Sequence, residues 1–256
     1  MKNSTKRFSN RVEFYVRARP NYPAAFMGFL RSELNLNPSH RIADIGSGTG
    51  LLSELFLRNG NTVTGVEPNA EMRAAGDEFL KPFPNFHSVD GAAEATTLPN
   101  HCADFVVAGQ AFHWFDPPKA RDEFLRILVP DGWVVLVWNE RKTTGGGFDS
   151  AYETIVQKFA KEPEVDFHTT VTGAANKVLG LFFGPPHFRT REFANFQDMS
   201  LDDVKARILS SSYMPLPDDP SFAAMLAEAE RAFAGNAVGG VVRISYDTRV
   251  YYGKMT

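Results

Sequence analysis

Gly46, Gly48 and Gly50 alternate with other residues directly after the short apolar run 41–45 and directly before a segment with helical periodicity. Bare backbone at the end of a strand, followed by the N-terminus of a helix, lets a ligand approach the main chain closely. Glu67 ends the next apolar run, and a carboxylate can accept hydrogen bonds from both hydroxyls of a ribose. This spacing predicts a binding surface for a ligand that contains a ribose.

Leu51 and Leu52, which follow the last glycine, disfavour two common nucleotide sites. A loop that holds a nucleoside triphosphate needs Lys and Ser or Thr after its last glycine. A dinucleotide fingerprint, G-x-G-x-x-G, needs its third glycine at the position of Leu51. A nicotinamide-dependent oxidoreductase stays open as an alternative, and so does a regulatory module that binds a nucleoside without catalysis.

Short apolar runs separated by amphipathic segments continue along the chain and predict an α/β fold. Continuous apolar strands are typical of a mostly parallel sheet that helices cover on both faces. The expected strands are 41–45, 62–66, 86–89, 103–108 and 133–138, and the expected helices between them are 51–58, 70–80 and 118–128. After Arg141 the rhythm changes, to helix-like segments at 149–161, 171–183 and 200–212 and strand-like segments at 188–196 and 241–253.

Charge and composition favour a small-molecule partner. The 256 residues include 27 Lys and Arg and 30 Asp and Glu, for a net charge of −3, so no overall basic field is present to hold a nucleic acid. The longest apolar run, 133–138, is far too short to span a bilayer. The single cysteine, Cys102, fits a reducing compartment. We expect a soluble, cytoplasmic protein that binds neither nucleic acid nor membrane and acts as a monomer or homodimer.

Histidines outside the glycine-rich part are scattered. His101, His168 and His187 lack the spacing of metal ligands, and no cysteine cage is available to supplement them. We therefore expect no metal site.

Several segments occur in a specific order: "ADIGSGTG" followed by the acid Glu67, then "DGAAEATTLP" (90–99), "FVVAGQAFHWFD" (105–116) and "ARDEFLRILVPDGWVVLVWN" (120–139). Together they resemble the class I S-adenosylmethionine-dependent methyltransferases, of the methyltransferase type 11 domain family. "RARPNYP" (17–23) and "HWF" are similar to the branch around trans-aconitate-type small-molecule methyltransferases. The resemblance covers about the first 140 residues and implies S-adenosylmethionine as cofactor, S-adenosylhomocysteine as product and no metal.

The same resemblance implies a seven-stranded Rossmann-like sheet, mostly parallel with the last strand antiparallel, with helices on both faces and helical additions that form a lid. We expect residues 1–36 to form an N-terminal helical lid segment and 37–140 to form the core that binds S-adenosylmethionine. Residues 141–256 would be the C-terminal part of the same domain, with helical cap insertions and the last two strands.

The resemblance also implies which residues contact the cofactor. Those expected to line its methionine part are Asp44, Gly46, Ser47, Gly48, Gln110 and Ala111. Those expected around its ribose and adenine are Glu67, Pro68, Asn69, Met72, Ala93 and Glu94, with Glu67 on the ribose hydroxyls and the backbone N–H of Ala93 on adenine. Relatives often carry a polar residue where this chain has Ala92, so the adenine amino group is left to Asp90 or to backbone alone.

A third group of residues is expected near the methyl acceptor: Tyr15, Arg17, Arg19, Tyr22, His113, Trp114, Trp138, Arg141 and Tyr213. Prolines restrict the backbone at Arg19 and Tyr22, which favours a defined elbow serving as a lid over a solvated charged face. His113 and Trp114 follow the fourth strand, at the sheet edge where ligands bind, and the alternative for them is an apolar corner. Trp138 closes its strand and is expected in the core at the border of the pocket.

The chemistry of the acceptor stays open. The sulfonium of S-adenosylmethionine is already activated, so methyl transfer mainly requires an acceptor placed in line and the exclusion of water. A carboxylate acceptor is ionised at neutral pH and would need only cations such as Arg17, Arg19 or Arg141. A hydroxyl, amine or carbon acceptor would need a base, for which His113 is the candidate.

Overall fold

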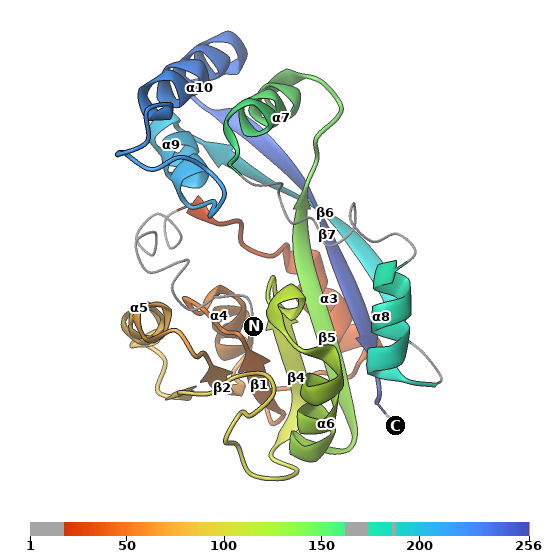
Figure 1. Ribbon diagram of the computed structural model, residues 1–256. Helices are drawn as coiled ribbons and strands as arrows, with labels where there is room; N and C mark the ends of the chain where they lie inside the picture. Colours follow the sequence, from red (N-terminus) through yellow and green to blue (C-terminus); the bar gives the residue numbers. More distant parts are fainter. Residues whose placement is uncertain (1–17, 162–173, 186–187, 256) are drawn as a thin grey trace.

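The computed structural model describes residues 18–161, 174–185 and 188–255, and shows a seven-stranded sheet in the order β3-β2-β1-β4-β5-β7-β6 (Figure 1). The strands are β1 (Arg41–Ile45), β2 (Thr62–Val66), β3 (Phe86–Val89), β4 (Ala103–Gly109), β5 (Leu128–Arg141), β6 (Arg189–Met199) and β7 (Val242–Gly253). β7 pairs antiparallel with both of its neighbours, and all other pairs are parallel. The predicted mostly parallel sheet with an antiparallel last strand is confirmed.

Helices cover both faces of this sheet, as expected. The described helices are α3 (Ala24–Glu33), α4 (Leu51–Arg58), α5 (Ala70–Leu80), α6 (Pro117–Ile127), α7 (Gly147–Phe159), α8 (Ala174–Phe183), α9 (Leu201–Leu209) and α10 (Phe222–Asn236). Side chains alternate between the faces of a strand, so Val106 and Val134 pack with α6 and α8, whereas Val107 and Val135 pack with α3 and α4. β4 and β5 are therefore buried on both sides, which explains their continuous apolar sequence.

The N-terminal part of the described chain belongs to the core. Phe26 and Leu30 of α3 are fully buried, and Phe29 packs edge-on against Tyr252 of β7 with ring centroids 4.9 Å apart. Of the segment 1–36, α3 is therefore a helix that covers the sheet, and the residues 18–23 before it are the part that passes over the strand ends. Tyr15 and Arg17 lie outside the described residues.

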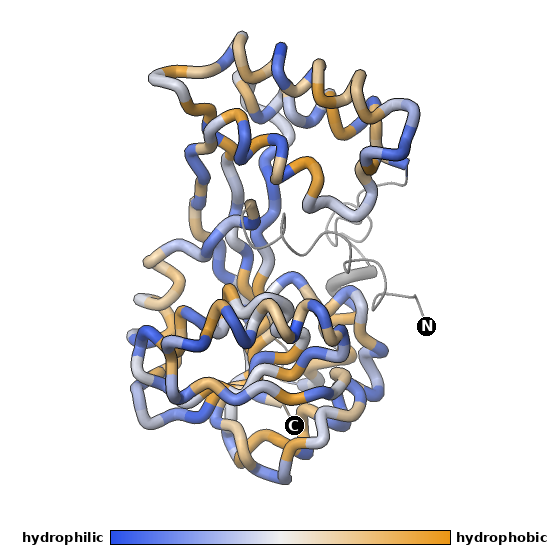
Figure 2. The backbone as a smooth tube through the Cα atoms, turned by 90° about the vertical axis from the view of Figure 1, so that its left-hand side faces the viewer, coloured by the Kyte–Doolittle hydropathy of each residue, from blue (hydrophilic) through white to orange (hydrophobic). Residues whose placement is uncertain are grey.

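Three helices, α7, α9 and α10, form what we call the cap, at one end of the long strands (Figures 1 and 2). β5 ends at the register pair Arg141–Tyr246, and the ladder of β6 and β7 continues beyond it. Val242, Ile244 and Tyr246 alternate along this extension of β7 and are buried with the cap helices in a hydrophobic cluster of their own. The cap is thus a second packing centre attached to the sheet.

The sequence underestimated this part of the chain. β5 spans 14 residues rather than the expected 133–138, and β6 continues to Met199. α10 was not predicted, because its alanine-rich sequence gives weak amphipathic periodicity and only Met225 and Ala229 are buried. The short 3-10 helix Phe112–Trp114 was also missed, since one turn is too short to show a period.

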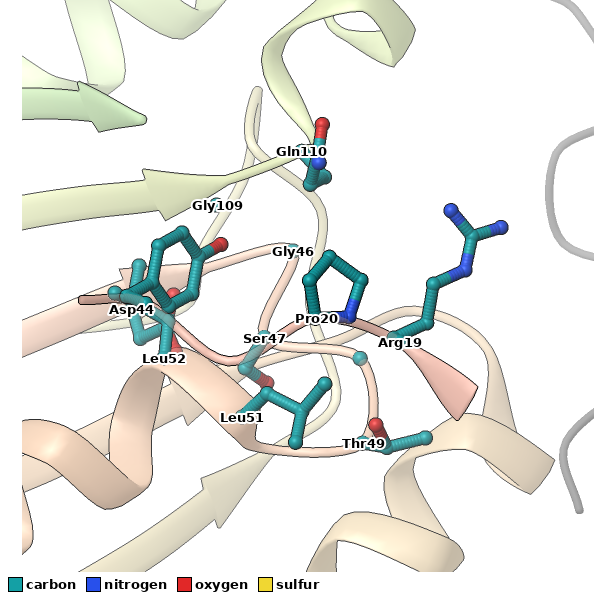
Figure 3. Close-up of a pocket in the computed structure, with 12 residues that line it drawn as sticks. Arg19, Pro20, Asp44, Gly46, Ser47, Thr49, Leu51, Leu52, Gly109 and Gln110 are labelled. Atoms are coloured by element: carbon teal, nitrogen blue, oxygen red, sulfur yellow. The ribbon is translucent and has the colours of Figure 1, made fainter. Parts of the chain in front are cut away.

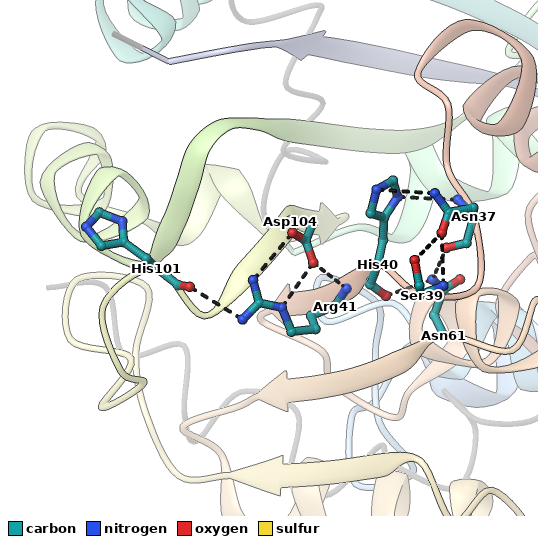
Figure 4. A network of polar contacts seen from close by, with 7 residues as sticks. All are labelled: Asn37, Ser39, His40, Arg41, Asn61, His101 and Asp104. Carbon is teal, nitrogen blue, oxygen red and sulfur yellow. Dashed lines mark hydrogen bonds and ion pairs between the residues drawn. The ribbon is translucent and has the colours of Figure 1, made fainter.

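A polar network fixes the end of the sheet opposite the glycines (Figure 4). Arg41 at the start of β1 donates from its backbone N–H and from Nε to Asp104 of β4, at 2.7 and 3.1 Å. Burial raises the pKa of Asp104, but these hydrogen bonds outweigh it and hold the pKa below its usual value. Asn61, fully buried, donates from Nδ2 to the carbonyls of Asn37 and His40, both at 2.8 Å. The network ties the loops before β1 and β2 together.

Within the described residues, no helix is long and apolar enough to cross a membrane.

Replacement of Asn61 tests this network. Asn61→Ala removes a fully buried side chain and its hydrogen bonds to the carbonyls of Asn37 and His40, so we expect the free energy of unfolding to fall by about 1–3 kcal/mol. The measurement is urea denaturation followed by circular dichroism. Asn85→Ala, at an exposed neighbouring loop position, is the control and should change stability by less than about 0.5 kcal/mol. Equal stability of the two variants would contradict the role given to Asn61.

Candidate functional site

A cavity lies at the carboxyl ends of β1 and β4, the edge of a parallel sheet where ligands bind (Figure 3). It encloses about 450 Å³ of space that no atom fills, part of it open to solvent. The residues that line it are Arg19, Pro20, Tyr22, Asp44, Gly46, Ser47, Gly48, Thr49, Leu51, Leu52, Gly109 and Gln110. The glycine loop therefore forms one wall, and the elbow before α3 forms another.

The glycine loop adopts a backbone that side chains would not permit. Gly46, Gly48 and Gly50 have φ angles of 71°, 55° and 87°, in the left-handed region. A Cβ on Gly46 would lie 2.7 Å from Cβ of Ala111, and one on Gly50 would lie 2.5 Å from Cδ1 of Leu80. These contacts hold the loop close to its neighbours and leave its main chain open to the cavity.

Asp44 and Thr49 present unused polar atoms in the wall of this cavity. Asp44 is fully buried, and its Oδ2 accepts a hydrogen bond from the Ser53 hydroxyl at 2.6 Å. Its Oδ1 and the Thr49 hydroxyl are sealed from solvent and have no hydrogen-bond partner among the residues that the structure describes. Burial raises the pKa of Asp44 to about 7, against the lowering effect of the Ser53 hydrogen bond. A buried acceptor of this kind needs a donor from a ligand.

Glu67 lies behind the loop, at the end of β2. Its two carboxylate oxygens accept hydrogen bonds from the backbone N–H groups of Gly48, at 3.0 Å, and Asn69, at 2.8 Å. Burial raises the pKa of Glu67, although both hydrogen bonds oppose the rise. Each carboxylate oxygen retains acceptor capacity, so the side chain can still bind two further donors.

Asn139, which the sequence analysis did not select, fixes the elbow over the cavity. Its Nδ2 donates to the carbonyls of Pro20 and Asn21, at 3.3 and 3.4 Å, and its own carbonyl accepts from Nε2 of Gln110 at 3.0 Å. Asn195 of β6 adds a 2.7 Å bond to the carbonyl of Asn21. An asparagine at the end of an apolar strand was the signal available in the sequence.

The structure brings together only part of the predicted cofactor set. Gly46, Ser47 and Gly48 line the cavity with Asp44 and Gln110. Predicted residues that do not line it are Glu67, Pro68, Asn69, Met72, Ala93, Glu94 and Ala111. Several of these have local roles: Asn69 caps α5, Met72 packs 3.3 Å from the Cβ position of Gly48, and Glu94 accepts from the backbone of Asp116 at 2.6 Å. Pro68 is exposed, Ala93 is buried in the core, and exposed Asp90 pairs with Arg73 at 3.2 Å.

Five lining residues were not selected from the sequence: Pro20, Thr49, Leu51, Leu52 and Gly109. Thr49 lies between two of the glycines, which was a usable signal. Gly109 ends β4, and a Cβ there would overlap the Tyr22 hydroxyl. That contact joins segments far apart in the sequence, so no local pattern could indicate it.

The residues expected near the acceptor are spread around the cavity. Tyr22 and Arg19 line it, and Arg19 projects away from the glycine loop (Figure 3) to donate from Nη2 to the Ser210 carbonyl at 3.1 Å. His113 and Trp114 are half-buried on the 3-10 helix, with ring centroids 5.0 Å apart, and neither lines the cavity.

Three further candidates lie away from the cavity lining. Trp138 is 3% exposed and packs edge-on against Phe112, inside the core. Arg141 pairs with Glu153 of α7 at 2.8 Å, and its guanidinium lies 4.9 Å from the ring centroid of Tyr152. Tyr213 is half-buried after α9.

Comparison with known proteins assigns the glycine-rich part of the chain to a family. Residues 43–136 match the model of the methyltransferase domain family. These residues are therefore similar to a methyltransferase domain, and they carry the parallel strands β1 to β5 of the sheet. The match begins at the residue before Asp44 and ends within β5, so it contains the glycine loop, Glu67 and Gln110.

Curated relatives and solved structures are similar to this methyltransferase domain. An uncharacterized methyltransferase of Schizosaccharomyces pombe is 33% identical over 135 residues, 52% of this chain and 53% of the relative. The malonyl-[acyl-carrier protein] O-methyltransferase of Pectobacterium atrosepticum is 32% identical over 109 residues, 39% of this chain and 40% of that protein. The chain thus spans about half the length of the first relative, 53%, and 40% of the second.

The fold is shared more widely. A solved structure from Anaeromyxobacter dehalogenans, provisionally named a type II methyltransferase, superposes with a TM-score of 0.63 at 19% identity, over 92% of this chain and 97% of that one. The similarity in architecture therefore extends beyond the methyltransferase domain into the C-terminal half.

The cavity of the methyltransferase domain suits the cofactor of this family, S-adenosylmethionine. Asp44 Oδ1, buried without a partner among the described residues, is an acceptor for an ammonium group. The remaining acceptor capacity of Glu67 suits a ribose diol. Among the described residues, no group of three or more His, Cys, Asp or Glu side chains is arranged to hold a metal ion.

The buried carboxyl of Asp44 predicts a pH dependence of stability. Because its pKa is raised from 3.8 to about 7 in the folded protein, the folded state holds this proton more tightly. The contribution of Asp44 to stability therefore falls as pH rises from about 4 to about 7, and the penalty is complete above that range. Asp44→Asn removes the penalty, so we expect this variant to gain stability relative to wild type as pH rises through this window.

Urea denaturation at a series of pH values measures this effect. Asp104→Asn is the control with the opposite sign, because the pKa of Asp104 is lowered and its contribution is lost as pH falls. A difference between Asp44→Asn and wild type that does not change with pH would contradict the shifted pKa.

Proposed function

We propose that the chain is an S-adenosylmethionine-dependent methyltransferase that transfers a methyl group to a small-molecule acceptor carrying a carboxylate. The observation that carries the first part is the unpartnered Asp44 Oδ1 in the wall of the glycine-loop cavity, within a methyltransferase domain. The proposal includes a cytoplasmic protein without a metal, acting as a monomer or homodimer.

The cofactor would be held by residues from three strand ends. Asp44, Ser47 and Gln110 would bind its methionine part, with the main chain of Gly46 and Gly48 in close contact. Glu67 would bind the ribose hydroxyls from behind the loop, and Asn69 and Met72 would flank the adenosine. The remaining residues expected around the cofactor are Pro68, Ala93, Glu94 and Ala111.

Bound S-adenosylmethionine supplies an activated methyl group and leaves as S-adenosylhomocysteine. The chain must then place the acceptor in line with that methyl group and exclude water. The elbow 19–22, held by Asn139 and Asn195, is positioned to close the cavity on the acceptor side. Tyr22 and Arg19 would contact the acceptor from this elbow.

A carboxylate acceptor agrees with the charges near the cavity. A carboxylate is ionised at neutral pH and needs no base, only cations that orient it. Arg19 lines the cavity and supplies such a cation. The Pectobacterium relative, which is similar to 39% of this chain, is named a malonyl-[acyl-carrier protein] O-methyltransferase, and transfer of a methyl group to oxygen is the chemistry that a carboxylate acceptor requires.

Two alternatives make different predictions for ligand binding. A nicotinamide-dependent oxidoreductase would bind NAD or NADP, which Leu51 at the third glycine position disfavours. A regulatory module would bind a nucleoside without turnover. Calorimetric titration with S-adenosylhomocysteine, NAD and NADP, followed by an assay with labelled methyl donor, separates the three. Binding of a dinucleotide alone would overturn the proposal.

Glu67→Ala tests the ribose contact. Loss of charge-assisted hydrogen bonds should weaken the affinity for S-adenosylhomocysteine by more than about 1 kcal/mol, measured by calorimetry. Glu67→Gln, which keeps one acceptor oxygen, should fall between wild type and Glu67→Ala. Glu71→Ala, exposed in the first turn of α5, is the matched control and should bind as wild type does. Unchanged affinity in Glu67→Ala would reject the role of Glu67.

His113→Ala tests the candidate base. We expect lower turnover with unchanged affinity for S-adenosylhomocysteine, because His113 would act on the acceptor side. A loss of about 10²–10⁴-fold would identify a general base and hence a hydroxyl, amine or carbon acceptor. A smaller loss agrees with a carboxylate acceptor, which needs no base. Equal losses of turnover and cofactor affinity would show that the histidine is structural.

A further inference from the structure

Arg207, in the last turn of α9, is a buried cation whose contacts among the described residues include no carboxylate. The residue is only 4% exposed. Its guanidinium contacts are to the Tyr246 hydroxyl at 3.5 Å from Nε, and to the hydroxyls of Ser210 and Ser211 at 3.4 and 3.0 Å from Nη1. Within the described part of the chain, no Asp or Glu contacts this guanidinium.

These contacts leave most of the hydrogen-bonding capacity of Arg207 unused. Two of the three distances lie at the long limit of a hydrogen bond, and none of the three involves Nη2. The three hydroxyls are also engaged elsewhere: Ser210 and Ser211 donate to the Arg207 carbonyl, and Tyr246 donates to Oε1 of Gln197 at 2.9 Å. A planar fork of N–H donors is therefore available for a further acceptor.

Other arginines of this chain, unlike Arg207, form ion pairs with carboxylates among the described residues. Arginines that pair with a carboxylate within 3.1 Å include Arg41, Arg58, Arg126, Arg141, Arg231, Arg243 and Arg249. Most of these are at least partly exposed, where an ion pair matters least. Arg207, by contrast, lies where an uncompensated charge costs several kcal/mol.

Arg207 stays charged in this setting. Burial lowers the pKa of its guanidinium, but the neighbouring Tyr246, Tyr152 and Tyr213 outweigh burial and hold the pKa above its usual value. The carbonyl end of α9 also favours a cation, although that effect is small next to the cost of burial. Tyrosines are uncharged at neutral pH, where the described contacts of the guanidinium are hydrogen bonds to hydroxyl groups, so an anionic group beside it would add to the stabilisation of the charge.

One residue links the guanidinium to the cofactor cavity. Arg19 lines that cavity and donates from Nη2 to the carbonyl of Ser210, and the hydroxyl of Ser210 is a contact of Arg207. In Figure 1, α9 lies in the cap, and the segment that leads into α3 passes below it. A single residue, Ser210, thus connects the two arginines.

We propose that Arg207 binds a carboxylate group of the methyl acceptor, on the cap side of the cofactor cavity. This proposal rests on the proposed function and specifies the residue that selects an acidic acceptor. It differs from the sequence-based expectation, which gave this task to Arg17, Arg19 or Arg141. Arg141 already has Glu153 as its partner, and Arg17 lies outside the described residues.

The geometry of the guanidinium sets the ligand chemistry. A planar fork matches the two oxygens of a carboxylate, which gives both orientation and charge-assisted hydrogen bonds. Lysine at this position would keep the charge and lose the paired geometry. Methionine would keep the apolar stem and remove the charge.

The experiment measures the affinity of the full-length protein for paired probes: succinate and benzoate, and the matching neutral amides succinamide and benzamide. Calorimetry on wild type, Arg207→Met, Arg207→Lys and Arg231→Met compares the acids with the amides. Arg231, exposed in α10, is the control that removes the same charge from the cap surface. We expect wild type and Arg231→Met to prefer the acids, Arg207→Met to lose the preference by at least about tenfold, and Arg207→Lys to lie between.

Thermal unfolding without added anions separates binding from a structural role. Arg207→Met removes an uncompensated buried charge, so its melting temperature should equal or exceed that of wild type. Addition of succinate should raise the melting temperature of wild type and leave that of Arg207→Met unchanged. Arg207→Met that melts well below wild type, with Arg207→Lys restoring stability but no acid preference in any protein, would overturn the proposal.

Nuclear magnetic resonance of arginine Nε–H groups provides a test that needs no stable variant. Titration of wild type with succinate should shift one buried arginine resonance, assigned through Arg207→Lys, and succinamide should not. Absence of such a shift overturns the proposal, as does a response to inorganic phosphate without a response to succinate. Binding of S-adenosylhomocysteine is measured separately. If S-adenosylhomocysteine does not bind but the preference for acids is intact, only the methyltransferase activity is refuted. If S-adenosylhomocysteine binds but the preference for acids is absent, only the role of Arg207 is refuted.

Discussion

The close approach of loop 46–50 to its neighbours is the constraint on which the site depends. Gly46 can lie against Ala111, and Gly50 against Leu80, only because neither glycine carries a Cβ. This approach brings the ends of β1 and β4 to the same cavity and places the N–H of Gly48 on the carboxylate of Glu67. A Cβ on Gly46 or Gly50 would overlap these neighbours, so either substitution would move the loop away from the elements that it packs against.

Three buried ionisable groups surround the proposed reaction site, and their signs differ by side. Asp44 and Glu67 lie on the cofactor side, where burial raises the pKa of each. Arg207 lies on the cap side without a carboxylate among its contacts within the described residues. Burial of the charged forms of Asp44 and Glu67 reduces stability in the free protein, because charge is removed from water without full compensation. The two packing centres, around the sheet and within the cap, supply the hydrophobic stabilisation that offsets this cost. Under the two proposals, the cofactor would compensate Asp44, and the carboxylate of the acceptor would compensate Arg207.

The connection between cap and sheet explains how these groups are held in place. The ladder of β6 and β7 runs past the end of β5, so the cap is built on strands that also belong to the central sheet. Asn139 and Asn195, on β5 and β6, hold the elbow that carries Arg19 and Tyr22. The position of the acceptor side relative to the cofactor side is thus determined by continuous hydrogen-bonded strands rather than by a flexible linker.

The sequence by itself determined the class of fold, the positions of the first strands along the chain and the glycine loop, because these depend on local periodicity and on residues close together in the chain. Predicted strands 41–45, 62–66 and 86–89 match the structure, and Asp44, Gly46, Ser47, Gly48 and Gln110 line one cavity. Only the tertiary structure decided the extent of β5, the existence of α10, the contact of Tyr22 with Gly109 and the setting of Arg207. In the sequence, Arg207 is one basic residue in an amphipathic helix, indistinguishable from a solvated one. Its burial, and the lack of an acidic contact among the described residues, depend on residues from 152 to 246 that packing brings together. No local pattern in the sequence encodes contacts between residues so far apart.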